Sequence, residues 1–275
     1  MFDFSYLQKQ ARQEVKICLQ AWTEILNDEL GDRIDYVYSK GSAMKKWDSA
    51  IDYVPVISDV DIHILLKDQN ALFSESEDAF TDAMRFSKRY EDIFFELEPN
   101  PLHFPRSQLI HVNEFLKEEG FVPPRVEDVK PVIGTPRQNS LQSSETIRQI
   151  DLSNLLKLKD YLDAVPMVAV DRAGFDFWSL IRRMLWKVSP APVRVITQSH
   201  EDPLEVWTWN RTKIASTLDE IELSDIAEQY RGFYEAGWDL FLSNMTSRDD
   251  YRRMVEFGYR VLRNCYEKAK ELDSQ

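Results

Sequence analysis

Residues 58–66 read SDVDIHILL, and this short stretch decides how the rest of the chain is interpreted. The polar residues Asp59, Asp61 and His63 alternate with apolar valine and isoleucine residues. Because successive side chains of a β-strand point to opposite faces of the sheet, the alternation predicts a strand with one apolar face. Both carboxylates and the imidazole then share the other face.

Two carboxylates side by side on one strand repel each other, so Asp59 and Asp61 need compensating positive charge. A divalent cation supplies it, and Mg²⁺ is typically held by one or two carboxylates together with substrate phosphates. Asp59 and Asp61 are therefore the predicted metal ligands, for Mg²⁺ or Mn²⁺. The alternative is a strand at the edge of the sheet whose polar face is solvated.

Upstream, residues 34–38 (IDYVY) predict a second strand, which runs into Gly41 and Ser42. A glycine lets the backbone approach a ligand closely, and free N–H groups at the start of a helical turn attract phosphate oxygens. The hydroxyl of Ser42 adds a donor, and Lys45 or Lys46 adds positive charge. The sequence therefore predicts a phosphate-binding turn.

Together these residues resemble the nucleotidyltransferase superfamily of DNA polymerase β. The mark of that superfamily is an apolar strand, a Gly-Ser pair, a short helix, and Asp-x-Asp within a strand. Here residues 37–42 read VYSKGS and residues 59–62 read DVDI. The chain is similar to small bacterial and archaeal members with a C-terminal helical domain, including aminoglycoside adenylyltransferases. The motifs cover residues 30–66, and the two-domain layout extends the resemblance loosely over the whole chain.

The spacing of the motifs departs from the family pattern. Residues 43–58 separate the Gly-Ser pair from the first aspartate, a longer gap than is usual in the family. The sequence therefore indicates an insertion around residues 47–55.

The family also carries a third carboxylate on a later strand, and the predicted strand here, residues 108–112 (QLIHV), has none. The aligned position holds His111, or Gln108 in another register. Glu96 and Glu98 are alternatives if their own segment forms a strand. His111 becomes the candidate catalytic base, since a neutral imidazole titrates near neutral pH.

The resemblance implies an enzyme that moves a nucleoside monophosphate from a nucleoside triphosphate, expected to be ATP, to a hydroxyl of a small molecule and releases pyrophosphate. Asp59 and Asp61 would hold two metal ions, and Gly41 and Ser42 the β- and γ-phosphates. An aminoglycoside-like compound is the expected acceptor. Two alternatives stay open: a catalytically weak nucleotide-binding or regulatory protein of the same fold, and a nucleotidyltransferase that modifies proteins.

The predicted elements indicate an α/β (α+β) fold in two domains. Residues 1–136 form a nucleotidyltransferase domain, a mixed sheet with flanking helices at about 7–26 and 74–95, the second capped by Ser74. Residues 134–144 are the predicted linker. Residues 145–275 form an all-α helical bundle that binds the substrate, with helices expected at 147–162, 175–187, 207–218, 225–244 and 248–272 and breaks at Pro190 and Pro192.

The chain has 275 residues, with 34 Lys and Arg against 47 Asp and Glu and a formal net charge of −13. A surface with this charge balance repels polyanions on average, so a nucleic-acid partner is not expected. The excess of acidic residues either keeps the protein soluble or attracts a cationic acceptor. No apolar run reaches the roughly 18 residues needed to cross a bilayer, so a cytoplasmic protein without a membrane partner is expected. The tryptophans beyond residue 170 predict either the core of a helix bundle or the wall of an acidic, aromatic cleft.

Overall fold

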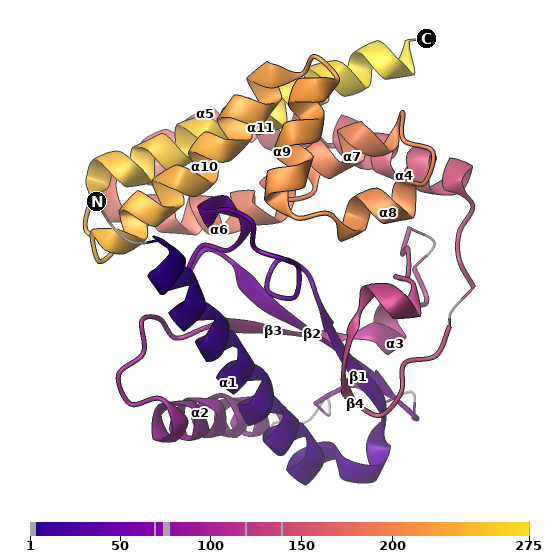
Figure 1. The fold of residues 1–275 in the computed structure, drawn as a ribbon, viewed down its shortest axis with the longest axis vertical. Coiled ribbons are helices and arrows are strands. Elements are labelled where there is room, and N and C mark those ends of the chain that lie inside the picture. Colours follow the sequence, from indigo (N-terminus) through magenta and orange to yellow (C-terminus); the bar gives the residue numbers. More distant parts are fainter. Residues whose placement is uncertain (1–3, 69, 74–77, 119, 139, 275) are drawn as a thin grey trace. The chain divides into compact units, whose positions relative to one another are not determined.

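The computed structural model describes residues 4–68, 70–73, 78–118, 120–138 and 140–274. The chain has an α+β fold whose C-terminal part is helical (Figure 1). It divides into two compact units. The sheet unit comprises Met1–Lys45 and Ser58–Leu141, and the helical unit comprises Lys46–Ile57 and Gln142–Gln275.

Within the described residues, the sheet has four strands in the order β3-β2-β1-β4. The strands are β1 (Ile34–Lys40), β2 (Asp59–Leu66), β3 (Arg106–His111) and β4 (Lys130–Ile133). Strand β1 is antiparallel to both β2 and β4, whereas β3 is parallel to β2. The three strands predicted from the sequence are confirmed.

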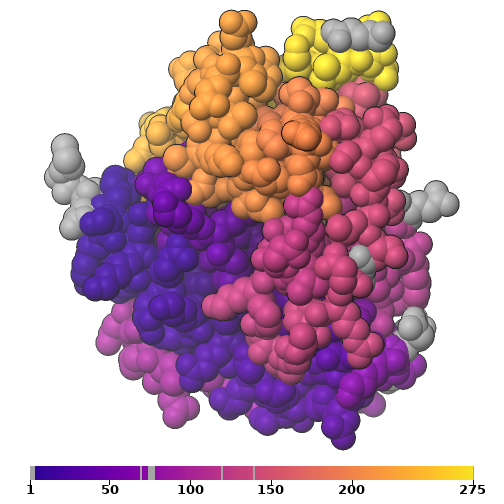
Figure 2. Space-filling model, turned by 45° about the vertical axis from the view of Figure 1, so that its right-hand side comes forward, coloured from indigo at the N-terminus to yellow at the C-terminus, as the bar shows by residue number. Residues whose placement is uncertain are grey.

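Strand β4 was not predicted, because it has only four residues and contains Pro131. A proline cannot donate a hydrogen bond to a ladder, so it is tolerated on an edge strand, which is where β4 lies. Lys130 and Pro131 are exposed, and Figure 2 shows this part of the chain at the surface. The strand therefore forms the edge of the sheet next to β1, although its sequence shows no alternating pattern.

The helices of the sheet unit are α1 (Phe4–Leu30), α2 (Asp78–Leu97) and the short α3 (Val112–Phe115). Helices α1 and α2 pack against each other, and the ring of Trp22 stacks on that of Tyr90 with centroids 5.1 Å apart. Val60, Ile62 and Ile64, on the apolar side of β2, are fully buried. The predicted first helix and apolar strand face are thus confirmed, whereas the predicted cap at Ser74 lies outside the described residues.

The helical unit contains α4 (Ser144–Leu156), α5 (Leu158–Asp171), α6 (Phe177–Val188), α7 (Ala191–Thr197), α8 (Pro203–Thr208), α9 (Arg211–Glu220), α10 (Ser224–Leu242) and α11 (Arg248–Asp273). Helices α10 and α11 run side by side (Figure 1), and α11 also contacts α4 to α7. A Cβ on Gly258 would collide with Met184 and Phe233, so this glycine permits the close packing of α11.

Several helix boundaries differ from the prediction. The helix expected at 147–162 is divided at Lys157 into α4 and α5, and the one expected at 207–218 is divided into α8 and α9. Helix α7 forms where Pro190 and Pro192 predicted only a break. Prolines are tolerated in the first turn of a helix, because the N–H groups there lack partners within the helix.

The insertion predicted around residues 47–55 belongs to the helical unit. It contains a short 3₁₀ turn, η2 (Ala50–Asp52), and its carbonyl oxygens accept hydrogen bonds from that unit. Trp238 Nε1 donates to Ala50 at 2.7 Å, and Arg211 Nη1 donates to Ile51 at 2.9 Å. The chain therefore enters and leaves the helical unit between the two halves of the sequence motif.

Candidate active site

The registers of β1, β2 and β3 bring five polar residues to one side and one end of the sheet. Asp61 of β2 is opposite Lys40 of β1 and Gln108 of β3, and Asp59 is opposite Arg106 of β3. Residues that are opposite in register lie on the same face of a sheet. We call these five residues the polar face.

The turn after β1 brings the two predicted motifs together. Gly41 has φ +86°, and a Cβ at this position would run into Oδ2 of Asp61. Only glycine adopts this φ readily, and only glycine leaves room for the carboxylate. The Oγ of Ser39 also donates to the carbonyl of Asp61 at 2.7 Å, which holds β2 against the end of β1.

The segment after Gly41 is a turn and not the start of a helix. The N–H of Met44 donates to the carbonyl of Gly41 at 3.1 Å, and residues 42–45 continue as turn and bend. Ser42 and Lys45 belong to this turn, and Arg12 of α1 donates to the carbonyl of Lys45 at 3.3 Å. The turn predicted to bind phosphate thus contacts α1, but the expected contribution of a helix N-terminus is absent from this described segment.

The polar face contains its own positive charge. Arg106 forms an ion pair with Asp59. Burial lowers the pKa of the Lys40 ammonium group, while the nearby charge of Asp61 opposes this change. Each carboxylate therefore has a basic neighbour, and part of the compensation expected from a metal ion comes from the chain itself.

His63, which shares the side of the two aspartates, separates the polar face from an apolar region. Its ring stacks on Tyr38 with centroids 4.7 Å apart, and Tyr38 belongs to a small core with Tyr36 and Val112. Burial, aided by the charge of Lys40, lowers the pKa of His63 to about 3. His63 is therefore neutral at physiological pH.

The structure does not place His111 with the aspartates. His111 is opposite Ile64, so it belongs to the other side of the sheet from Asp61. It also lies three residues beyond Gln108, roughly 10 Å along a strand. The interpretation of His111 as the base at this site is thus not supported by its position.

Glu96 and Glu98, the remaining candidates for the third acid, are not on the sheet either. Glu96 lies in α2 and is exposed, and Glu98 follows the end of that helix. The position on β3 opposite Asp61 holds the uncharged amide of Gln108. This corresponds to the alternative register named above, in which Gln108 and not His111 aligns with the third acid. The described part of the sheet therefore puts an amide where the family pattern has a carboxylate.

Lys40 and Arg106 were not among the site residues predicted from the sequence. Lys40 could have been found, because Tyr38 and Lys40 share a face by simple alternation and Lys40 immediately precedes Gly41. Arg106 was missed because β3 begins two residues before the predicted start at Gln108, directly after Pro105. Its pairing with Asp59 depends on the register of β3 with β2, which the sequence does not specify.

The donor set fits a divalent cation. Asp59 and Asp61 on one strand face, beside a turn suited to phosphates, match the usual ligands of Mg²⁺. They suit one ion more readily than two, since Gln108 and Arg106 occupy the neighbouring positions on β3. Across the described ranges, no three His, Cys, Asp or Glu side chains gather into a metal-binding group.

Three tryptophans of the helical unit are held by internal hydrogen bonds. The indole N–H groups of Trp207 and Trp209 donate to Asp151 at 3.3 Å and Glu205 at 3.2 Å, and that of Trp238 to the segment at Ala50. These contacts agree with a structural role for the three rings.

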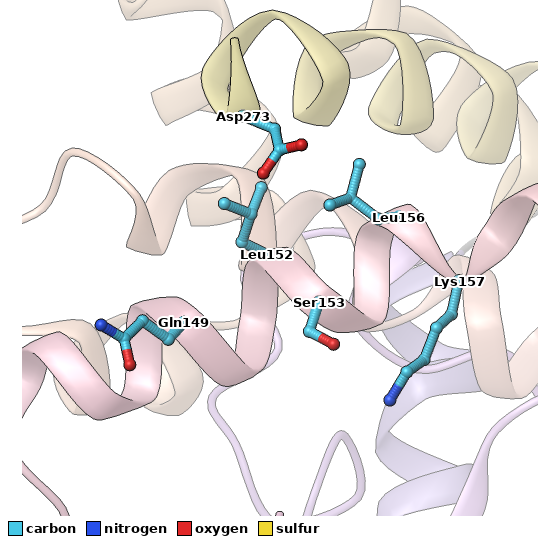
Figure 3. Close-up of a pocket in the computed structure, with 6 residues that line it drawn as sticks. All are labelled: Gln149, Leu152, Ser153, Leu156, Lys157 and Asp273. Atoms are coloured by element: carbon cyan, nitrogen blue, oxygen red, sulfur yellow. The ribbon is translucent and has the colours of Figure 1, made fainter. Parts of the chain in front are cut away.

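A shallow hollow of about 460 Å³ opens between α4 and the end of α11 (Figure 3). Leu152 and Leu156 point toward α11, and Asp273 points back toward α4. Gln149, Ser153 and Lys157 complete its lining. All of these residues belong to the helical unit, so the hollow contains none of the polar face.

No family model, curated protein or solved structure matches this chain. Within the described ranges, no helix combines the length and the apolar character that a membrane span requires.

Proposed function

We propose that this chain is a nucleotidyltransferase, which uses Mg²⁺ or Mn²⁺ to move a nucleoside monophosphate from a nucleoside triphosphate to a hydroxyl of a small molecule. One observation carries the proposal: the carboxylate of Asp61 rests against Gly41 in the turn that precedes Ser42. A phosphate-binding turn and a metal-binding carboxylate are thereby within reach of one triphosphate.

Each residue of the site has a role in this proposal. The turn at Gly41 and Ser42 binds the β- and γ-phosphates through backbone N–H groups and a hydroxyl, with Lys45 nearby. Asp59 and Asp61 would hold the metal ion, which when bound neutralises the pyrophosphate and lowers the pKa of the acceptor hydroxyl. This chemistry depends mainly on positioning and on charge stabilisation.

The reaction is a substitution at the α-phosphorus. The acceptor oxygen forms a bond to this phosphorus, and the bond to the bridging oxygen breaks, with its electron pair leaving on pyrophosphate. The hydroxyl proton passes to solvent, and His111, on the other side of the sheet from the aspartates, takes no part in this step.

A second candidate function is binding of a nucleotide without transfer, as in a regulatory protein. It is favoured by Gln108 in the place beside Asp61 and by the ion pair between Asp59 and Arg106. Both features reduce the negative charge available for metal ions.

The test is a transfer assay with α-labelled ATP, GTP, CTP and UTP in Mg²⁺ or Mn²⁺. Acceptors are aminoglycosides, which the net charge of −13 favours, neutral polyols, and proteins resolved on a gel. We expect pyrophosphate release with one small-molecule acceptor, and loss of at least about a hundredfold in Asp61→Asn. Asp35→Asn, at the far end of β1, is the matched control and should retain activity.

Equal turnover by Asp61→Asn and the wild type would reject the proposal. Nucleotide binding without pyrophosphate release across the panel would favour the regulatory function. Label on protein alone would identify a protein-directed transferase.

A further inference from the structure

The ion pair between Arg106 and Asp59 lies inside the site and not on the outer surface of the sheet unit. The two residues are opposite each other on the parallel strands β2 and β3. Their side chains are 35% and 13% exposed, and the buried atoms include Nε and Nη2 of Arg106 and Oδ1 of Asp59, so the pair is largely shielded from water.

The polar face holds as many basic side chains as carboxylates. Asp59 and Asp61 are opposed by Arg106 and Lys40, and Gln108 carries no charge. A bare divalent cation that approaches Asp59 therefore meets the guanidinium of Arg106 a few ångströms away and is repelled by it.

We infer that Arg106 is an internal counter-ion of Asp59 that competes with the divalent cation, so that metal and nucleoside triphosphate bind well only together. This inference rests on the proposed function, because it concerns the same site.

The triphosphate supplies the exchange partner for Arg106. A guanidinium forms paired, charge-assisted hydrogen bonds to phosphate oxygens as readily as to a carboxylate. Once Arg106 turns to a phosphate, its positive charge no longer competes with the cation at Asp59. Nucleotide and metal then strengthen each other's binding, and by linkage the effect is reciprocal.

The test is Mn²⁺ binding, followed by the electron paramagnetic resonance signal of free Mn²⁺, with no nucleotide present. Arg106→Gln should bind Mn²⁺ about tenfold more tightly than the wild type, because the competing charge is gone. Arg106→Met, which keeps the aliphatic part of the side chain, should show the same gain, whereas Arg106→Lys should stay near the wild type. Circular dichroism melting confirms that each variant is folded.

A matched control is Arg137→Gln. Arg137 also pairs with an aspartate, Asp35, at 2.7 Å, but at the opposite end of β1. Its loss should leave Mn²⁺ affinity unchanged. In Arg106→Gln combined with Asp59→Asn the gain should vanish. A non-hydrolysable ATP analogue should raise Mn²⁺ affinity in the wild type and much less in Arg106→Gln.

Equal Mn²⁺ affinity in the wild type, Arg106→Gln and Arg106→Met would overturn this inference and leave the proposed function standing. A gain in the two variants without nucleotidyl transfer to any acceptor would support the inference and reject the transferase. No Mn²⁺ binding by any variant would overturn the inference together with the metal site.

Discussion

Asp52 and Asp59 lie seven residues apart in the sequence but are used in opposite ways. The carboxylate of Asp52 is 1% exposed and accepts hydrogen bonds from the backbone N–H groups of Asp48, Ser49 and Thr212 and from the hydroxyl of Thr212, at 2.7–2.9 Å. Asp59 is met by the long side chain of Arg106 and stays partly accessible.

The difference lies in the donors. Backbone N–H groups and a short hydroxyl are fixed by the fold, so Asp52 cannot release them without local unfolding. A guanidinium on a long side chain can turn away, and under the inference above Arg106 leaves Asp59 in this way when a cation binds. Asp52 thus has partners that the fold fixes, whereas Asp59 has a partner that can move.

Asp52→Asn should have the largest effect on stability of the substitutions considered. The amide replaces one acceptor oxygen by a group that faces N–H donors, so several buried hydrogen bonds are lost. We expect a loss of about 3 kcal/mol in the free energy of unfolding, measured by urea denaturation. Asp59→Asn should cost far less in stability while removing activity. Equal losses in the two variants would show that the contrast is false.

Gly41→Ala should have the next largest effect. The new Cβ meets both an unfavourable φ of +86° and the carboxylate of Asp61. We expect a loss of about 2 kcal/mol in stability, together with weaker nucleotide binding. Gly174→Ala is the matched control, because its φ is +72° but nothing lies within 4 Å of the added Cβ.

The Gly174→Ala control should lose only about 1 kcal/mol, through backbone strain alone. If both alanine variants lose the same stability, the contact between Gly41 and Asp61 has no energetic weight.

Asp151 of α4 provides the smallest and most specific test, because burial outweighs both its hydrogen bonds and its ion pair with Arg194, whose Nε lies 3.5 Å from Oδ1. Burial raises the pKa of its carboxyl, although Thr197 and Trp207 donate to it at 2.8 and 3.3 Å. The folded state therefore keeps the proton to higher pH than the unfolded chain. The stability contributed by this group is present at low pH and is lost as pH rises through the raised pKa.

Urea denaturation between pH 4 and pH 7 checks this expectation. The stability of the wild type relative to Asp151→Asn should fall as pH rises across that window. Parallel curves for the wild type and Asp151→Asn would contradict the prediction.

The sequence predicted the parts of the fold and site that depend on local pattern. The alternation in β2 is a direct consequence of strand geometry, and Gly41 is required by a turn that follows a strand. Arg106 became visible only through the register of two strands that are forty residues apart in the sequence. Such pairing depends on tertiary packing and not on local preference.

The helical elements show the same division. The long amphipathic α10 and α11 were predicted nearly to the residue, because their apolar stripes persist over several turns. The short α7 was not predicted, because prolines at its start indicate a break. The insertion at 47–55 has no periodic pattern. Hydrogen bonds to Thr212, Arg211 and Trp238 hold it in place instead.

The segment Lys46–Ile57 has a consequence for how this protein can be divided. A cut near residue 141 separates the sequence into two apparent halves, but the first half then carries a piece that belongs to the second. A fragment of residues 142–275 would leave the start of α9 without Asp52, and a fragment of residues 1–141 would leave Asp52 without Thr212. Neither half is a transferable part, so exchange of the helical unit between related chains would have to replace both of its segments together.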